Sequence, residues 1–107
     1  MEVKSIALPR LNGLNPTLES TALKLMEEAG ELAQAIGKFR GMSGETRSMS
    51  DVEAIEAISK ELLDVAQTAV SMMFVLEETF QVRVEDEVQK HYAKLMTKGY
   101  ILPEHSS

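Results

Sequence analysis

The sequence predicts an all-α protein, an antiparallel helical bundle of three main helices per chain that is completed by subunit association. The composition is 44% hydrophobic but only 5% aromatic, and includes seven methionines, which favours helices. Apolar residues recur at helical spacing in three segments. The second half of the middle segment is apolar on almost every side, so we expect a partner subunit to cover it. A chain of 107 residues is expected to form one domain, 1–107.

The first fifteen residues contain proline and glycine and predict an irregular N-terminal arm, 1–15. Asn15 and Pro16 then suit a helix start, because Asn caps helices and Pro is tolerated at the first helical position. The first helix is predicted from about Pro16 to Phe39. Its predicted apolar stripe consists of Leu18, Ala22, Leu25, Met26, Ala29, Leu32, Ala33 and Ile36.

Segment 37–50 is rich in glycine, serine and threonine and predicts a loop. Ser50 and Glu53 fit a capping box, with a hydroxyl at the cap and a carboxylate three residues on. The second helix is therefore predicted from about Asp51 to Glu78.

A short break near 80–82 precedes the third predicted helix, which Gly99 is placed to end. The tail, 102–107, is expected to be irregular. The apolar stripe of this helix consists of Val84, Val88, Tyr92, Leu95 and Met96.

Charge and composition exclude several functions. Seventeen acidic against eleven basic residues give a net charge of −6, which opposes binding to a nucleic acid polymer. The absence of cysteine excludes disulfides, thiolate metal sites and cysteine nucleophiles. No apolar run is long enough for a membrane span and no signal-peptide pattern is present, so we expect a cytoplasmic protein without a membrane partner.

Two consecutive helices carry paired carboxylates at the same spacing. Glu28 and Glu31 share one helix face, and Glu61 and Asp64 repeat that spacing on the next helix. Both pairs border an apolar stripe, so packing the stripes together brings four carboxylates towards one another. Their repulsion and desolvation are relieved either by raised pKa values or by a hard divalent cation that prefers oxygen ligands. The pattern thus predicts a Mg²⁺ site, with Mn²⁺ as a substitute ion.

The alternative for these carboxylates is a solvated helix face. Lys24 lies four residues before Glu28, and Lys60 directly precedes Glu61, so ion pairs offer an ordinary explanation. For one pair alone the solvated face is favoured, whereas two pairs on consecutive helices give both interpretations equal weight. A ferritin-type iron site is disfavoured, because neither histidine of the chain, at 91 and 105, lies three residues after an acidic residue.

The stretches LMEEAGELAQAI and KELLDVAQ resemble the MazG-like family of all-α nucleoside triphosphate pyrophosphohydrolases. That family carries EExxE on one helix and ExxD on the next, and the resemblance extends from Thr17 to Ile101. Glu27 matches the first glutamate of EExxE, and its role is left open. The resemblance implies that four residues are both the Mg²⁺ ligands and the catalytic residues: Glu28, Glu31, Glu61 and Asp64.

The resemblance also implies an enzyme, a hydrolase of phosphoric anhydrides that cleaves a nucleoside triphosphate between the α and β phosphorus atoms. The products are a nucleoside monophosphate and pyrophosphate, and removal of unwanted nucleotides is the expected role. Glu31 and Glu61 are separated by 29 residues, a long spacer for this family, which leaves substrate specificity open. The expected assembly is a homodimer or a homotetramer.

Lys94 and Lys98, four residues apart on the third helix, are candidates to contact the substrate phosphates. A solvated basic face near a helix C-terminus is the favoured alternative for them. Two other functions remain open for the whole chain. One is a catalytically inactive helical module that binds nucleotide or protein and holds a structural cation, and the other is a dimerisation bundle without a ligand.

Overall fold

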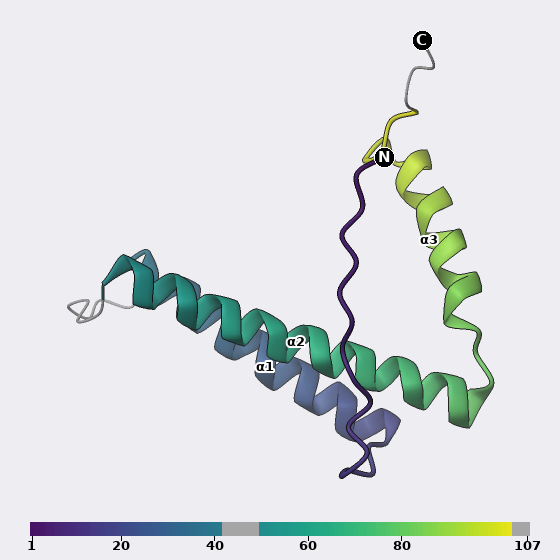
Figure 1. Ribbon diagram of the computed structural model, residues 1–107, viewed down its shortest axis with the longest axis horizontal. Helices are drawn as coiled ribbons and strands as arrows, with labels where there is room; N and C mark the ends of the chain where they lie inside the picture. Colours follow the sequence, from purple (N-terminus) through teal and green to yellow (C-terminus); the bar gives the residue numbers. More distant parts are fainter. Residues whose placement is uncertain (42–49, 104–107) are drawn as a thin grey trace.

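The computed structural model describes residues 1–41 and 50–103, which contain three α-helices and no strand. The predicted all-α class with three helices is confirmed (Figure 1). Most of the predicted loop 37–50 and the end of the predicted tail 102–107 lie outside the described residues. None of the described helices is long and apolar enough to cross a membrane. The helices are α1 (Leu18–Phe39), α2 (Asp51–Phe80) and α3 (Val84–Thr97).

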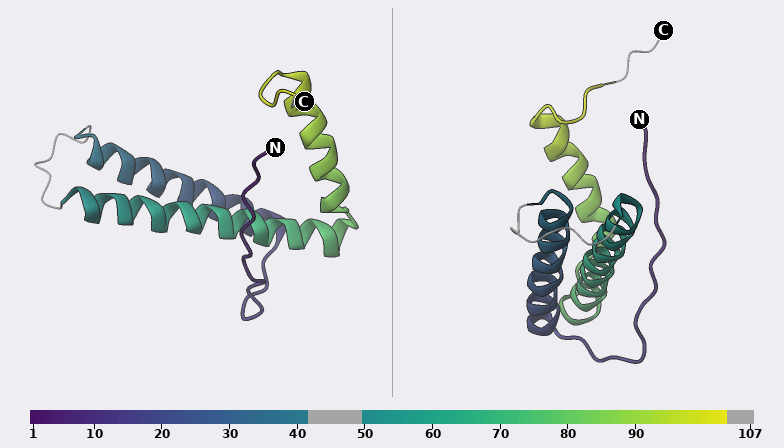
Figure 2. Two further views of the ribbon diagram at one scale, coloured as in Figure 1. Left: turned by 45° about the horizontal axis from the view of Figure 1, so that its top comes forward. Right: turned by 90° about the vertical axis from the view of Figure 1, so that its left-hand side faces the viewer.

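The helices α1 and α2 form a long antiparallel pair (Figures 1 and 2). In both helices, positions that alternate between spacings of three and four residues are buried or half-buried, which is the period of a coiled-coil seam. Three of the small residues in the seam, Thr21, Ala54 and Thr68, are buried and let the helices approach closely. The seam positions are Leu18, Thr21, Leu25, Glu28, Leu32, Ala35 and Phe39 in α1, and Ala54, Ile58, Glu61, Val65, Thr68, Met72 and Val75 in α2.

This seam corrects the predicted stripe of α1. Met26 is 74% exposed and Ile36 is 41% exposed, although both were predicted to face α2. Conversely, Glu28 is buried, so it occupies the seam instead of bordering it. A seam with a period of 3.5 residues drifts away from a stripe drawn at 3.6 residues per turn, and it passes through the polar residues Thr21 and Glu28, which a stripe of apolar residues leaves out.

The start of α1 differs from the prediction by two residues. Thr17 is the N-cap: its hydroxyl accepts a hydrogen bond from the Ser20 amide at 3.0 Å, and the Ser20 hydroxyl accepts one from the Thr17 amide at 2.8 Å. This reciprocal capping box satisfies two amides at the helix end, which the predicted start at Asn15–Pro16 does not offer. The predicted Asn15 cap is wrong for that reason.

The predicted start of α2 and the predicted end of α3 are confirmed. The Ser50 hydroxyl accepts a hydrogen bond from the Glu53 amide at 3.2 Å and caps α2. The helix continues to Phe80 and ends where Gln81 adopts a left-handed conformation, with φ 55°. After α3, Gly99 takes φ 77°, a conformation that glycine adopts at little cost.

Helix α3 leaves the C-terminal end of α2 and projects away from the α1–α2 pair (Figures 1 and 2). The core of the single chain is small, since Ala54 and Val75 are the buried hydrophobic residues among those described. Large apolar side chains such as Leu62 and Met73 remain 54% and 41% exposed. Subunit association therefore stays a prediction, and the exposed apolar surface is the observation that favours it.

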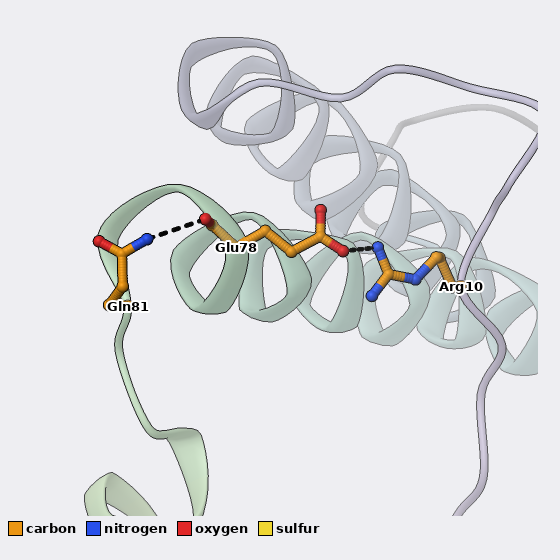
Figure 3. A network of polar contacts seen from close by, with 3 residues as sticks. All are labelled: Arg10, Glu78 and Gln81. Carbon is orange, nitrogen blue, oxygen red and sulfur yellow. Dashed lines mark hydrogen bonds and ion pairs between the residues drawn. The ribbon is translucent and has the colours of Figure 1, made fainter.

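The N-terminal arm has no regular secondary structure and crosses α2 (Figure 1). The Gln67 side chain donates a hydrogen bond to the Pro9 carbonyl at 2.8 Å. Further along α2, the Arg10 guanidinium lies 4.3 Å from the centroid of the Phe74 ring and forms an ion pair with Glu78 (Figure 3). The arm is thus held on α2 by side-chain contacts at three positions of the helix.

Candidate metal centre

Three carboxylates converge across the α1–α2 seam. Glu28, Glu31 and Glu61 each offer one carboxylate oxygen, and these oxygens all lie within 4.8 Å of one another. Glu28 and Glu31 lie three residues apart on α1, and Glu61 lies at a seam position of the antiparallel helix α2. Two short sequence motifs separated by a long spacer are therefore brought to one place. We call this group the acidic cluster.

Two oxygens of the acidic cluster are buried without a hydrogen-bond partner. Glu28 is 6% exposed, and its Oε1 is paired with Lys24 Nζ at 3.0 Å. The other oxygen of the same carboxylate, Oε2, has no partner, and neither has Oε2 of the half-buried Glu61. Buried polar atoms are nearly always paired, because an unpaired one keeps its full desolvation cost. Two such oxygens in the same small cluster are expected where a cation binds or where the carboxylates share a proton.

The electrostatics of the acidic cluster are those of crowded like charges. The pKa of Glu31 is raised above 4.5, chiefly by the negative charge of Glu28, then by desolvation, and then by the charge of Glu61. The pKa of Lys24 is raised above 10.5, chiefly by its hydrogen bond to Glu28. A proton or a cation close to these carboxylates therefore lowers their repulsion.

The raised pKa of Glu31 predicts a pH dependence of stability in metal-free buffer. The folded chain binds a proton at Glu31 more tightly than the unfolded chain, in which this pKa is near 4.5. The contribution of Glu31 to the free energy of unfolding should therefore be fully present below about pH 4.5 and be lost as the pH rises through the raised pKa. Urea unfolding in EDTA across this range should show a smaller fall for Glu31→Gln than for wild type. The control is Glu27→Gln, at an exposed neighbouring position, which should leave the fall in unfolding free energy as in wild type. If Glu31→Gln also shows the wild-type fall, the pH dependence does not come from Glu31.

The donor set of the acidic cluster fits a hard cation. All three residues offer carboxylate oxygens, which Mg²⁺, Mn²⁺ and Ca²⁺ accept, and Mg²⁺ is typically held by one or two carboxylates with waters and substrate phosphates. The three oxygens come from a buried, an exposed and a half-buried residue, so one side of the cluster is open to solvent. A phosphate-bearing ligand can approach from that side.

The fourth predicted ligand, Asp64, is not a member of this close group. It follows Glu61 by one helical turn, its side chain is exposed, and its backbone carbonyl accepts a hydrogen bond from the Thr68 hydroxyl at 2.9 Å. The first glutamate of EExxE, Glu27, is also exposed and lies outside the group. The structure thus brings together three of the four predicted carboxylates.

The two predicted phosphate-contacting lysines lie elsewhere in a single chain. Lys94 is in the last turn of α3, and Lys98 caps that helix. Because α3 projects away from the α1–α2 pair, it does not bring either lysine beside the acidic cluster. Lys98 Nζ instead lies 5.9 Å from the centroid of the Tyr100 ring. A role for these lysines in phosphate binding stays a prediction.

A cavity of about 310 Å³ lies under the N-terminal arm. It is lined by arm residues and by positions of α2 from Ser71 to Thr79, and it includes Arg10 and Phe74. At 1.5 Å per residue, Ser71 is already about 15 Å from Glu61 along the axis of α2. The cavity is therefore separate from the acidic cluster.

The chain is similar to a known protein family. The model of a protein family described as the MazG nucleotide pyrophosphohydrolase domain matches residues 16–99. That range includes the acidic cluster, Asp64 and all three helices. No curated protein and no solved structure matches the chain significantly.

Proposed function

The chain belongs to the MazG nucleotide pyrophosphohydrolase domain family, and we propose that it is a Mg²⁺-dependent nucleoside triphosphate pyrophosphohydrolase. The reaction cleaves the bond between the α-phosphorus and the bridging oxygen, and gives a nucleoside monophosphate and pyrophosphate. Family membership supports the class of reaction. The observation that carries the metal requirement is the acidic cluster, with its oxygens within 4.8 Å and two buried oxygens without partners.

Within this proposal, Glu28, Glu31 and Glu61 would hold Mg²⁺, or Mn²⁺ in its place, and Asp64 would join them from the next turn of α2. The bound ion would neutralise triphosphate charge and lower the pKa of a coordinated water. Through that ion, the carboxylates would fix the position of the phosphate chain on the open side of the cluster, whereas without it their negative charges would repel the phosphates. Precise positioning of the phosphate chain is the main requirement for phosphoryl transfer, because the attacking and the leaving oxygen lie roughly in line through the phosphorus in the transition state.

Glu31 is the best placed general base of the group. Glu28 is buried and paired with Lys24, whereas Glu31 is exposed. A carboxylate that water can reach and that has no cationic side chain bound to it is suited to accept a proton from the attacking water. The oxygen of that water then bonds to the α-phosphorus as the bridging oxygen leaves with pyrophosphate.

The proposed substrate is a nucleoside triphosphate, and the proposed role is removal of unwanted nucleotides from the pool. We also propose that the enzyme acts as a homodimer or a homotetramer. The single chain buries few hydrophobic residues, and Leu62 and Leu63 on α2 are 54% and 48% exposed. Apolar surface of this kind gains free energy when another subunit covers it.

Product analysis tests the reaction directly. Purified full-length protein is incubated with canonical and modified nucleoside triphosphates in Mg²⁺ or in EDTA, and the products are separated by ion-exchange chromatography. We expect nucleoside monophosphate and pyrophosphate in equal amounts in the presence of Mg²⁺, and no products in EDTA. Diphosphate with orthophosphate would overturn the proposal. An inactive protein that still gains melting temperature with nucleotide and Mg²⁺ would favour the inactive binding module.

A further inference from the structure

We propose that Lys24 is an exchangeable counter-ion of the acidic cluster. It neutralises Glu28 in the free protein, and it contacts the substrate phosphates once the metal ion and the triphosphate have bound. The inference rests on the proposed function and assigns a residue to it. The ion pair between Lys24 Nζ and Glu28 Oε1, at 3.0 Å, joins a cation on the surface to a carboxylate in the seam.

The burial of the two partners differs in a way that an ordinary surface ion pair does not show. The Glu28 side chain is 8% exposed, whereas the Lys24 side chain is 57% exposed. The carboxylate is thus fixed inside the seam, while the ammonium lies at the solvent side of the same group. Removal of this cation would leave Glu28 desolvated among like charges, so Lys24 supplies positive charge to the free protein.

The same position makes Lys24 a competitor for a metal ion. Glu28 holds Lys24 through Oε1, and its buried Oε2 is without a partner in the acidic cluster. A divalent cation at the cluster repels the nearby ammonium and weakens its hold on Glu28. A triphosphate arriving on the open side then offers oxygens to that ammonium, because lysine binds phosphate as a mobile point charge on a flexible stem.

Lys60 provides a matched comparison on the facing helix. It directly precedes Glu61 in the sequence, but its Nζ lies 3.6 Å from Glu56 one turn earlier. Both side chains of that pair are largely exposed, at 74% and 65%. Lys60 therefore has the same charge next to a residue of the acidic cluster, yet its ion pair lies outside the cluster.

The test uses two probes that need no turnover. Metal-free full-length protein is titrated with Mn²⁺ alone, followed by electron paramagnetic resonance. It is then titrated with tripolyphosphate in saturating Mg²⁺, followed by calorimetry, which probes phosphate contact without a base. For Lys24→Met we expect Mn²⁺ to bind about tenfold more tightly, because a repelling charge is gone. Tripolyphosphate should bind about tenfold more weakly, because a charged hydrogen bond is lost.

The controls separate this role from simpler ones. Lys24→Arg should restore both affinities to within about threefold of wild type, and Lys60→Met should leave both within about twofold, as for an exposed pair. If Lys24→Met binds both probes more weakly, Lys24 only positions Glu28. If it binds both as wild type does, the pair is an ordinary surface ion pair. Either result overturns the inference. Opposite shifts in a protein without hydrolase activity would overturn the proposed reaction but leave the role of Lys24 standing.

Discussion

Glu61→Gln should abolish hydrolysis, lowering kcat by about a thousandfold or more, while the helical fold survives. Glu61 is the contribution of α2 to the acidic cluster, and its carboxylate oxygen lies within 4.8 Å of those of Glu28 and Glu31. The amide has nearly the same shape but no charge, so the variant keeps the packing of the seam and loses the cation. Steady-state kinetics on the triphosphate that wild type hydrolyses best gives the loss.

The same variant should be more stable than wild type in EDTA. It removes one of three crowded negative charges, and a relief of about 1 kcal/mol raises the melting temperature of a domain of this size by roughly 4–8 °C. Circular dichroism melting in metal-free buffer measures this change. Lower activity together with a lower melting temperature would instead indicate a damaged fold, and wild-type activity would remove Glu61 from the site.

Asp64→Asn is the companion variant, because Asp64 is outside the close group of oxygens. The Asp64→Asn variant should bind the first Mn²⁺ ion with nearly the affinity of wild type. Its turnover should fall, because Asp64 is proposed to join the other carboxylates when metal and substrate are bound. Equal loss of Mn²⁺ affinity in Glu61→Gln and Asp64→Asn would show that all four carboxylates hold the first ion.

Mg²⁺ should stabilise the folded protein strongly, and its removal should stop hydrolysis completely. At a free concentration one hundred times the dissociation constant, an ion that binds the folded state alone adds about 2.7 kcal/mol to the free energy of unfolding. The physical reason is that the ion gives the unpartnered Oε2 atoms of Glu28 and Glu61 a partner and offsets the repulsion that raises the pKa of Glu31.

Thermal melting in EDTA and in increasing Mg²⁺ measures this stabilisation, and Glu28→Gln should reduce it to a small fraction of the wild-type shift. The control is Glu56→Gln, which removes an exposed carboxylate of the same helix pair outside the cluster. An equal shift in wild type and Glu28→Gln would show that Mg²⁺ binds elsewhere on this acidic chain. Hydrolysis that persists in EDTA would exclude the metal requirement.

The sequence alone determined the helices and their ends to within about two residues, because these depend on local interactions. Ser50 at the start of α2 and Gly99 after α3 act through hydrogen bonds and backbone conformation within a few residues. The paired carboxylates were also visible, since a spacing of three residues on a helix puts two side chains on one face. Family membership followed from the order of these motifs, and the family match confirmed it.

Only the tertiary structure decided which of these residues meet. The seam of α1 and α2 follows small residues as well as large apolar ones, so Glu28 lies within it while Met26 faces solvent. Asp64 shares a motif with Glu61 but lies one turn further along α2, and its oxygens are outside the group. Such placement depends on the rotation and register of two helices against each other, which local sequence does not fix. The burial of the carboxylate that Lys24 pairs with follows from that packing, whereas the distance of Lys94 from the acidic cluster follows from the direction in which α3 leaves α2.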